Sequence, residues 1–250
     1  MKDRVKVVVT GAAGQISYSL IPRLVDGHTF GDRIVDLELV EIPQVVDKLE
    51  GLVMELEDSN FPNMGNVNYT SNFEEAAQDA DWFLLVGSIP RGIVFNGKKI
   101  EERADLLQIN GGIFVGQGQA IGKFGKPDAK ILVVGNPANT NCLIAQRNAP
   151  GLDPAQFTAM TRLDHNRAST QLAQKTGFHV NDVKGLAIWG NHSATQYPDI
   201  FHATVDGSAA SELVSPLARE GPTCRPCDVR DQRPSPRPGV CGIGTARSVR

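Results

Sequence analysis

Two hydrophobic periods alternate along the first 160 residues of the chain. Short apolar runs, each typical of a buried strand of a parallel sheet, occur at 5–9, 37–42, 81–87 and 130–135. Between these runs apolar residues recur at helical spacing, and a further short strand is expected at 66–70. The predicted helices lie at 16–24, 49–56, 73–80 and 106–121. Strands that alternate with helices in this way favour an α/β fold with a doubly wound parallel sheet.

The first predicted strand is followed directly by TGAAGQIS, in which Gly11 and Gly14 precede a helix. A strand, a glycine loop and a helix start together form a unit that holds a pyrophosphate on backbone amides. Ser17 stands where the usual pattern has a third glycine, and it is small enough to allow close packing. Glu41 lies near the end of the second strand, where a carboxylate binds ribose hydroxyls and disfavours a 2′-phosphate. The pattern predicts NAD rather than NADP, with a solvated strand-end glutamate as the alternative.

The strand at 81–87 is followed by a long basic segment, SIPRGIVFNGKKIEER, which is predicted to be a loop. Arg91 and Arg103 flank it. In open α/β sheets ligands bind at the carboxyl ends of the strands, so this loop is expected to lie beside a ligand. The strand at 130–135 is followed by NPANTN, a predicted turn that begins with Asn136.

A second group of candidate residues lies between 160 and 198. Asp164 and Arg167, at i and i+3, are expected to project from one face at the start of a helix. His192 follows the apolar run 185–189, which predicts a buried strand that ends in a polar turn. A carboxylate that orients an imidazole and stabilises its protonated form makes a general acid/base. The spacing alone does not show that Asp164 and His192 meet, so ordinary surface or core roles remain the alternative.

Composition narrows the class of protein. The 250 residues suffice for one large or two medium domains, and 41% apolar with 21% charged residues is typical of a globular protein. A net charge of −3 and a pI of about 6.0 give no reason to expect nucleic acid or an anionic membrane as a partner. A strand is predicted almost at the first residue and no apolar run approaches a membrane span, so we expect a cytoplasmic protein.

Residues 221–250 differ in character from the rest. They contain six Arg and two Asp, no Lys, Glu or aromatic residue, and no helical or strand period. This composition predicts disorder, with a basic interaction tail as the alternative. Our hypothesis is out-of-frame translation after a frameshift near residues 215–221, which the coding DNA can test. Cys224 and Cys227 form a CxxC pair, but only Cys241 follows and no histidine is near, so no metal site is expected.

Five motifs in order, TGAAGQI, ELEDSNFP, GNPANTN, TRLDHNRA and IWGNHSATQYPD, carry a resemblance over residues 4–212 to the NAD-dependent malate dehydrogenases of the cytosolic and related bacterial type. The resemblance implies a Rossmann domain at 1–155 followed by an incomplete α+β substrate domain at 156–220. It also implies NAD as cofactor, malate and oxaloacetate as substrates, and a homodimer.

The resemblance also implies roles for five residues. His192 would accept a proton during malate oxidation, and Asp164 would orient it. Arg167 would hold the C1 carboxylate, Arg91 the distal carboxylate, and Arg103 would polarise the reacting oxygen. Two substrate carboxylates require at least two guanidinium partners, and planar bidentate pairing favours Arg over Lys.

Asn136 would contact both substrate and nicotinamide by the same resemblance. The implied cofactor-binding residues are Gly11, Gly14, Gln15, Ile16, Glu41, Gly87, Gln117 and Asn136.

The chain departs from this family in two places. Between Arg91 and Arg103 the loop is six residues longer than the usual PRGPGMER pattern. The family's substrate domain also continues well past residue 212, where this chain has the Pro/Arg tail, which predicts exposed apolar surface and poor stability.

Three other functions share features with these motifs. A lactate-type dehydrogenase shares the Asp–Arg–His chemistry, but Arg91 argues against it. A short-chain dehydrogenase needs a Tyr-x-x-x-Lys pair, and no tyrosine here has a lysine four residues on. A non-catalytic NAD-binding fragment of a malate dehydrogenase is the alternative from a different class.

Overall fold

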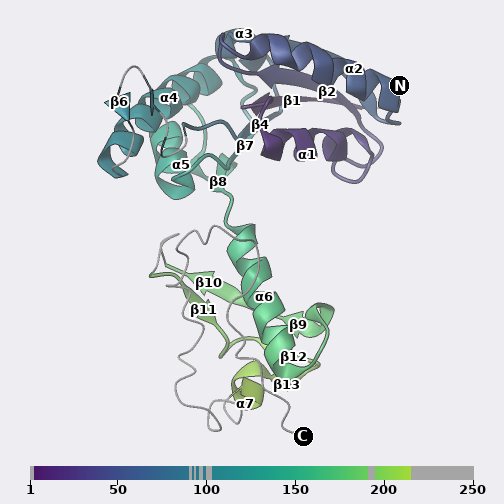
Figure 1. The fold of residues 1–250 in the computed structure, drawn as a ribbon, viewed down its shortest axis with the longest axis vertical. Helices are drawn as coiled ribbons and strands as arrows, with labels where there is room; N and C mark the ends of the chain where they lie inside the picture. The colour runs from purple at the N-terminus through teal and green to yellow at the C-terminus, as the bar shows by residue number, and fades with distance from the viewer. Residues whose placement is uncertain are drawn as a thin grey trace, which may run out of the picture. The chain divides into compact units, whose positions relative to one another are not determined.

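The structure is a computed structural model that describes residues 3–89, 92, 94–95, 98–99, 103–190 and 195–214. The chain forms two compact units, Met1–Met160 and Thr161–Arg250 (Figure 1). The change of unit therefore falls five residues later than the expected domain boundary at 155. The expected disordered tail lies outside the described residues.

The first unit is built on one six-stranded sheet in which every neighbouring pair is parallel. The order reverses between the first strand and the fourth, so the doubly wound sheet expected from the sequence is confirmed. From one edge to the other the strands are β3 (Met64–Thr70), β2 (Ile34–Val40), β1 (Arg4–Thr10), β4 (Trp82–Leu85), β7 (Lys130–Val133) and β8 (Phe157–Ala159).

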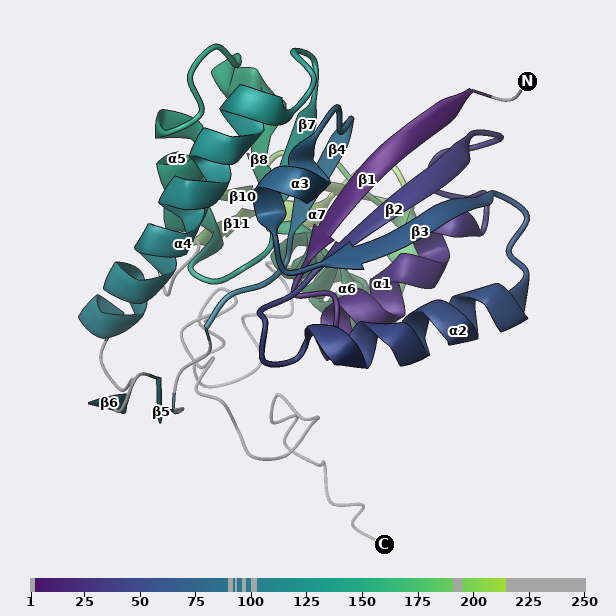
Figure 2. The same ribbon diagram turned by 90° about the horizontal axis from the view of Figure 1, so that it is seen from above.

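Helices lie on both faces of this sheet (Figure 2). One face packs on α1 (Gln15–Val25) and α2 (Leu49–Ser59), and the other on α3 (Phe73–Ala77), α4 (Arg103–Phe124) and α5 (Ala138–Arg147). Short 3-10 turns, η1 (Val46–Lys48) and η2 (Pro154–Gln156), precede α2 and β8.

The run VKVVV is apolar throughout because β1 is buried on both faces. Val7 and Val9 join the core under α1 and α2, while Val8 joins the core under the other three helices. All three are fully buried. Full burial of one such side chain contributes about 1.5–3 kcal/mol, so this strand anchors the first unit.

Several element boundaries differ from those expected. The strand predicted at 37–42 runs from Ile34 to Val40, which leaves Glu41 just beyond its end. The segment predicted as a plain loop contains a two-stranded antiparallel hairpin, β5 (Val94–Phe95) with β6 (Lys98–Lys99). The strands of this hairpin have two residues each, too few to show the alternation of apolar and polar residues that predicts a strand. The sequence does not predict β8 for the same reason, because it has three residues.

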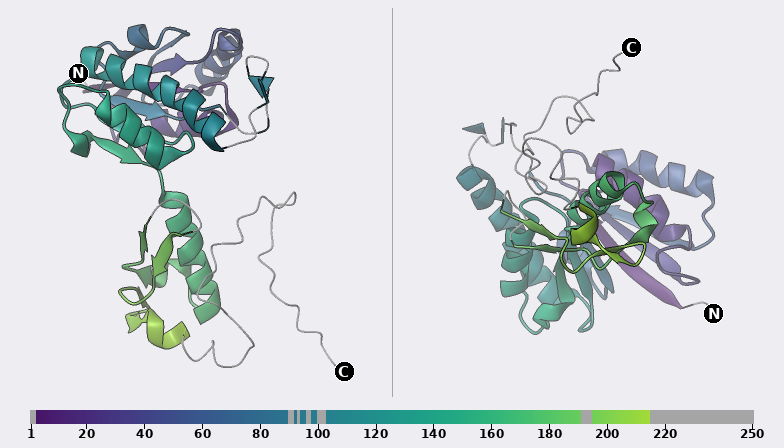
Figure 3. Two further views of the ribbon diagram at one scale, coloured as in Figure 1. Left: turned by 90° about the vertical axis from the view of Figure 1, so that its left-hand side faces the viewer. Right: turned by 90° about the horizontal axis from the view of Figure 1, so that it is seen from below.

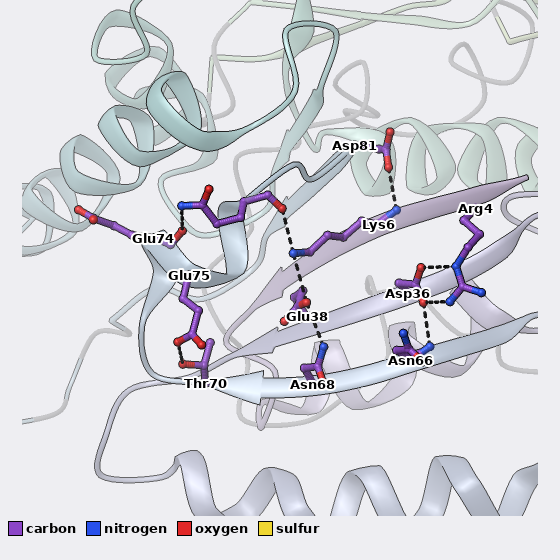
Figure 4. Close-up of polar contacts among 11 residues, drawn as sticks. Arg4, Lys6, Asp36, Glu38, Asn66, Asn68, Thr70, Glu74, Glu75 and Asp81 are labelled. Carbon is purple, nitrogen blue, oxygen red and sulfur yellow. Dashed lines mark hydrogen bonds and ion pairs between the residues drawn. The ribbon is translucent and has the colours of Figure 1, made fainter.

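No described helix covers part of one sheet face (Figure 2), and polar side chains line that part instead (Figure 4). Lys6 Nζ lies 3.2 Å from Glu38 Oε1, and Asn68 Nδ2 donates to the same oxygen at 3.1 Å. One step toward the strand starts, Arg4 donates twice to Asp36, with Nε to Oδ2 at 2.8 Å. Each charge therefore meets its counterpart on the neighbouring strand, where a parallel sheet usually has an apolar cover.

The second unit has an α+β arrangement, with α6 lying along small antiparallel sheets (Figure 3). Its core is small, formed by Leu172, Leu186, Ala203, Val205 and Ala210. The elements are α6 (Arg162–Thr176), η3 (Val180–Asp182), β9 (Val183–Lys184), β10 (Ala187–Trp189), β11 (Tyr197–Asp199), β12 (Thr204–Val205), β13 (Ser208–Ala209) and α7 (Ala210–Val214).

The expectation of a buried strand at 185–189 is wrong. Only Ala187–Trp189 of this run is a strand, and among the described strands it pairs with β11 alone, antiparallel. Trp189 is 59% exposed. A two-stranded ribbon of this kind buries one face at most, so its apolar residues remain partly in water. None of the described helices combines the length and apolar character needed to span a bilayer.

Candidate active site

The loops after three neighbouring strands, β1, β4 and β7, touch through their glycines. A Cβ built on Gly11 would lie 2.6 Å from Gly87 Cα, and one built on Gly135 would lie 2.9 Å from the Gly87 carbonyl oxygen. Gly11 also has a φ of +65°, a conformation that glycine adopts without strain. The Gly87 amide is fixed by two bonds at 3.1 Å, to the carbonyl and to the hydroxyl oxygen of Thr10. These backbones form a cradle at the point where the strand order reverses, which is where ligands bind in such sheets.

The start of α1 completes this cradle. The helix begins after Gly14, whose amide donates to the Gly11 carbonyl at 3.0 Å, and no described side chain caps it. The amides of the first turn therefore have no intrahelical partner and suit an anionic group such as a pyrophosphate. Ser17 is fully buried, so its small size does allow the close packing expected of it. Gln15 is exposed, and Ile16 is 63% exposed, so Ile16 lies outside the helix's buried apolar face.

Glu41 lies beside the glycine loop. Its Oε2 accepts a hydrogen bond from the Ala13 amide at 3.2 Å, and its Oε1 accepts one from the Ile42 amide at 3.0 Å. The carboxylate thus stands next to the loop predicted to hold the pyrophosphate, one strand away along the sheet edge. The close approach of the glycine backbones leaves no room for side chains in the cradle, and a carboxylate lies beside it. Both features fit a dinucleotide with free ribose hydroxyls.

The loop after β7 is held by a residue that sequence reasoning missed. Asn110 of α4 is fully buried, and its Nδ2 donates to the Asn136 carbonyl at 3.3 Å. Its Oδ1 accepts from the Ile89 amide at 2.8 Å. A polar residue within the apolar face that contains Phe114 was the signal available in the sequence.

Gln117 lies two turns beyond Asn110 on α4, about 10 Å along the helix axis. Its Oε1 is buried and has no hydrogen-bond partner among the described residues. The spacing of seven residues places Gln117 on the same face of α4 as the buried residues Asn110 and Phe114.

In the second unit Asp164 and Arg167 lie on one face of the first turns of α6, as their spacing predicts. Arg167 Nη1 is 4.0 Å from Asp164 Oδ1, with the arginine side chain 52% exposed and the aspartate 4% exposed. A carboxylate in the first turn of a helix is favoured by the helix dipole. The arrangement combines a buried carboxylate with a guanidinium that reaches the surface.

His165 follows Asp164 in the sequence and was not singled out. Burial lowers the pKa of its imidazole, and the charge of Arg162 lowers it further, while a hydrogen bond with the Leu186 backbone opposes both. His165 is therefore mainly neutral at pH 7. Of the other predicted residues, His192 and Arg91 lie outside the described residues, and only the backbone of Arg103, at the first position of α4, is described.

A second buried carboxylate joins the ends of β10 and β11. Asp199 Oδ2 accepts from Trp189 Nε1 at 2.9 Å and lies 2.7 Å from His202 Nδ1. The bond from Trp189, then that with His202, lowers the pKa of Asp199 to about 2. Asp199 thereby fixes Trp189, which precedes the segment that carries His192 in the sequence.

The comparisons with known proteins agree with this geometry. Residues 5–157 match the model of the lactate/malate dehydrogenase NAD binding domain, and residues 161–220 match that of the lactate/malate dehydrogenase alpha/beta C-terminal domain. The chain belongs to the lactate/malate dehydrogenase family, a family of oxidoreductases, and its cofactor is NAD.

Solved structures of this family resemble the chain. Malate dehydrogenase from Naegleria fowleri is 43% identical over 83% of this chain and 62% of its own, with a TM-score of 0.78. A ligand-free leucine-to-arginine variant of Trichomonas vaginalis lactate dehydrogenase is 41% identical over 82% and 59%, with a TM-score of 0.76. Lactate dehydrogenase of the same organism, in complex with NADH and oxamate, is 41% identical over 80% and 59%, with a TM-score of 0.73. The chain thus spans about six-tenths of the length of these relatives.

Proposed function

We propose that the chain is a malate dehydrogenase, which interconverts (S)-malate and oxaloacetate with NAD. The observation that carries the 2-hydroxy acid dehydrogenase chemistry is the Asp164–Arg167 pair on α6, a buried carboxylate beside an accessible guanidinium. The 43% identity to a malate dehydrogenase supports the same substrate.

Substrate binding falls to the arginines. Arg167 would pair with the C1 carboxylate as a planar fork, and Arg91 would meet the distal carboxylate. A monocarboxylate leaves Arg91 without a partner, so this residue favours dicarboxylates. Arg103 would polarise the reacting oxygen, and Asn136 would contact the substrate from the loop after β7.

Proton transfer falls to His192. Its imidazole would take the C2 hydroxyl proton as malate is oxidised and return it in the reverse reaction. Asp164 would orient that imidazole and stabilise its protonated form, and burial of the carboxylate strengthens this interaction. NAD, when bound, supplies the hydride acceptor.

The cofactor would be held by the cradle. The amides after Gly11 and Gly14 would bind the pyrophosphate, Gly87 would allow the backbone to approach closely, and Glu41 would bind the adenosine ribose. The carboxylate of Glu41 would repel a 2′-phosphate. Gln15, Ile16 and Gln117 complete the proposed cofactor set.

Two alternatives are retained. The 41% identity to a lactate dehydrogenase favours a lactate-type 2-hydroxy acid dehydrogenase. The short match to the C-terminal domain, residues 161–220, favours a non-catalytic NAD-binding fragment. A cytoplasmic homodimer is the assembly and location that we propose for the enzyme, with residues 1–155, 156–220 and 221–250 as its Rossmann domain, partial substrate domain and frameshift-derived tail.

The test is NADH oxidation by the purified chain with oxaloacetate and, separately, with pyruvate. Preferential turnover of oxaloacetate, abolished by His192→Asn and kept by His28→Asn at an exposed surface histidine, is the expected result. Preference for pyruvate would establish the lactate-type activity instead. NADH binding without turnover of either substrate would identify a binding fragment.

A further inference from the structure

Asn110 is the one polar side chain of α4 that is fully buried among the described residues of that helix. Within the part of the chain that the structure describes, its side-chain hydrogen bonds go to main-chain atoms of two separate loops. Its Oδ1 accepts from the Ile89 amide at 2.8 Å, while its Nδ2 donates to the Ile89 carbonyl at 3.2 Å and to the Asn136 carbonyl at 3.3 Å.

This set of bonds requires a carboxamide. The amide and carbonyl of Ile89 need one acceptor and one donor from the same planar group, and the Asn136 carbonyl needs a second donor. Aspartate offers acceptors only, and leucine, which has a similar shape, offers neither. Because the site is buried, water cannot replace the missing partner without a cost.

The two loops follow β4 and β7, which are neighbours in the sheet. Gly135 and Gly87 already approach closely between these loops, and the Gly135 amide donates to the carbonyl of Leu85, the last residue of β4, at 3.0 Å. The Asn110 carboxamide adds directional bonds that fix the rotation of the Ile89 peptide and the position of the Asn136 main chain. The position of that main chain determines where the Asn136 side chain begins.

We propose that Asn110 is a positioning residue, which holds the loops after β4 and β7 in register and thereby sets where the Asn136 side chain meets substrate and nicotinamide. This inference rests on the proposed function through the role of Asn136. Among the described residues Asn110 acts through main-chain atoms, so its proposed contribution is orientation rather than direct contact with substrate. Its removal should affect turnover far more than binding of the adenylate half of NADH, which the Gly11 and Glu41 region holds.

The test compares three variants in the complete chain. Asn110→Leu removes every bond, and Asn110→Asp keeps the acceptor for the Ile89 amide but loses both donors. Asn63→Leu is the matched control, because Asn63 is also buried and its Nδ2 also donates to a loop carbonyl, that of Gly31, at the amino end of the sheet.

The readouts are kcat/KM for oxaloacetate, Kd for NADH and hydrogen exchange at the Ile89 amide. For Asn110→Leu we expect kcat/KM to fall between about tenfold and about a hundredfold, with the NADH Kd within about threefold. The Ile89 amide should exchange faster in Asn110→Leu and remain protected in Asn110→Asp, while kcat/KM falls in both. Asn63→Leu should lower the melting temperature and keep kcat/KM per folded molecule.

Unchanged kcat/KM in folded Asn110→Leu would overturn the inference, as would an equal kinetic loss in Asn63→Leu. If Asn110→Leu does not fold, Asn110→Asp decides by the same kinetic criterion. Absence of turnover in the unmodified chain would count against the proposed function. In that case exchange at the Ile89 amide decides the positioning role, and unchanged protection in Asn110→Leu overturns it.

Discussion

Gly11 and Gly87 approach so closely that neither can carry a side chain. A Cβ on Gly11 would lie 2.6 Å from Gly87 Cα, and a Cβ on Gly87 would lie 2.9 Å from the Gly11 amide nitrogen. Backbone atoms cannot move aside as a side chain can, so any substitution separates the loops after β1 and β4. These two loops flank the point where the strand order of the sheet reverses.

We therefore expect Gly11→Ala to weaken NADH binding at least tenfold and to lower the melting temperature. The clash adds to a conformational cost of about 1–2 kcal/mol for an L-residue at positive φ. Titration of NADH fluorescence and thermal unfolding measure the two effects. Gly51→Ala is the control, because a Cβ on Gly51 in α2 meets nothing within 4 Å. Equal NADH affinity in Gly11→Ala and the unmodified chain would contradict the cradle.

Two glycines of α4 should respond in opposite directions to the same substitution. A Cβ on Gly116 meets nothing within 4 Å, so Gly116→Ala should stabilise the first unit by about 0.5–1 kcal/mol. A Cβ on Gly118 would lie 3.0 Å from Ala145 Cα and closer still to its carbonyl oxygen. Gly118→Ala should therefore push α4 from α5 and lower stability. Urea unfolding of the pair measures both, and a shift of the same sign in both variants would refute the packing argument.

Glu41→Gln should narrow the preference for NADH over NADPH by about tenfold, which corresponds to about 1.4 kcal/mol. The amide can still accept a hydrogen bond from the Ala13 backbone, but it no longer repels a 2′-phosphate. Binding constants for both dinucleotides measure the change. Glu38→Gln is the matched control within β2, since Glu38 pairs with Lys6 and Asn68 on the sheet face. If both variants shift the preference alike, overall charge rather than Glu41 sets it.

The sequence predicts the fold of the first unit well because its strands are buried on both faces. That burial appears in the sequence as the uninterrupted apolar run Val7, Val8 and Val9. The glycine loop that follows indicates the strand–loop–helix unit. Strand ends were less predictable, since β2 ends where its register with β3 ends, at the pair Val40 and Thr70, two residues that are far apart in the sequence. The strands of the second unit have only two or three residues, too few for a periodic pattern of apolar residues to predict them.

The geometry of the candidate site was predictable where spacing alone fixes it, since Asp164 and Arg167 lie on one face of α6. Asn110 and Asp199 were not predictable in this way, because each acts through contacts made between segments distant in sequence or folded back by a turn. A buried asparagine in an apolar helix face and an aspartate after a proline have many ordinary uses. Only the positions of Ile89, Asn136 and Trp189 show what these two residues hold.

Stability of the second unit should fall as the pH drops from about 4 to about 2. The pKa of Asp199 is lowered from 3.8 to about 2 by its bonds with Trp189 and His202. A carboxylate whose pKa is lower in the folded state contributes stability above its unfolded pKa and loses it as the pH falls through the folded value. Asp199→Asn should be less stable at pH 5 and less sensitive to pH within this window.

Trp189 fluorescence in a Trp82→Phe background measures unfolding of the second unit alone, because the chain has two tryptophans. Asp206→Asn serves as the control at an exposed turn between β12 and β13, where asparagine tolerates the positive φ of 48°. An identical pH dependence in Asp199→Asn and the unmodified chain would show that another group titrates.

The polar part of the sheet face, on β1 to β3, also affects the tendency of the protein to aggregate at high concentration. A bare apolar sheet face would invite a second sheet to stack on it, as happens in aggregates. Here stacking would strip water from Arg4, Lys6, Asp36 and Glu38, and removing ions from water costs several kcal/mol each. Because each of these charges already has a partner on its own sheet, a second sheet would add few new ion pairs to offset this cost. The paired charges thus keep this part of the sheet face hydrated and oppose self-association through it.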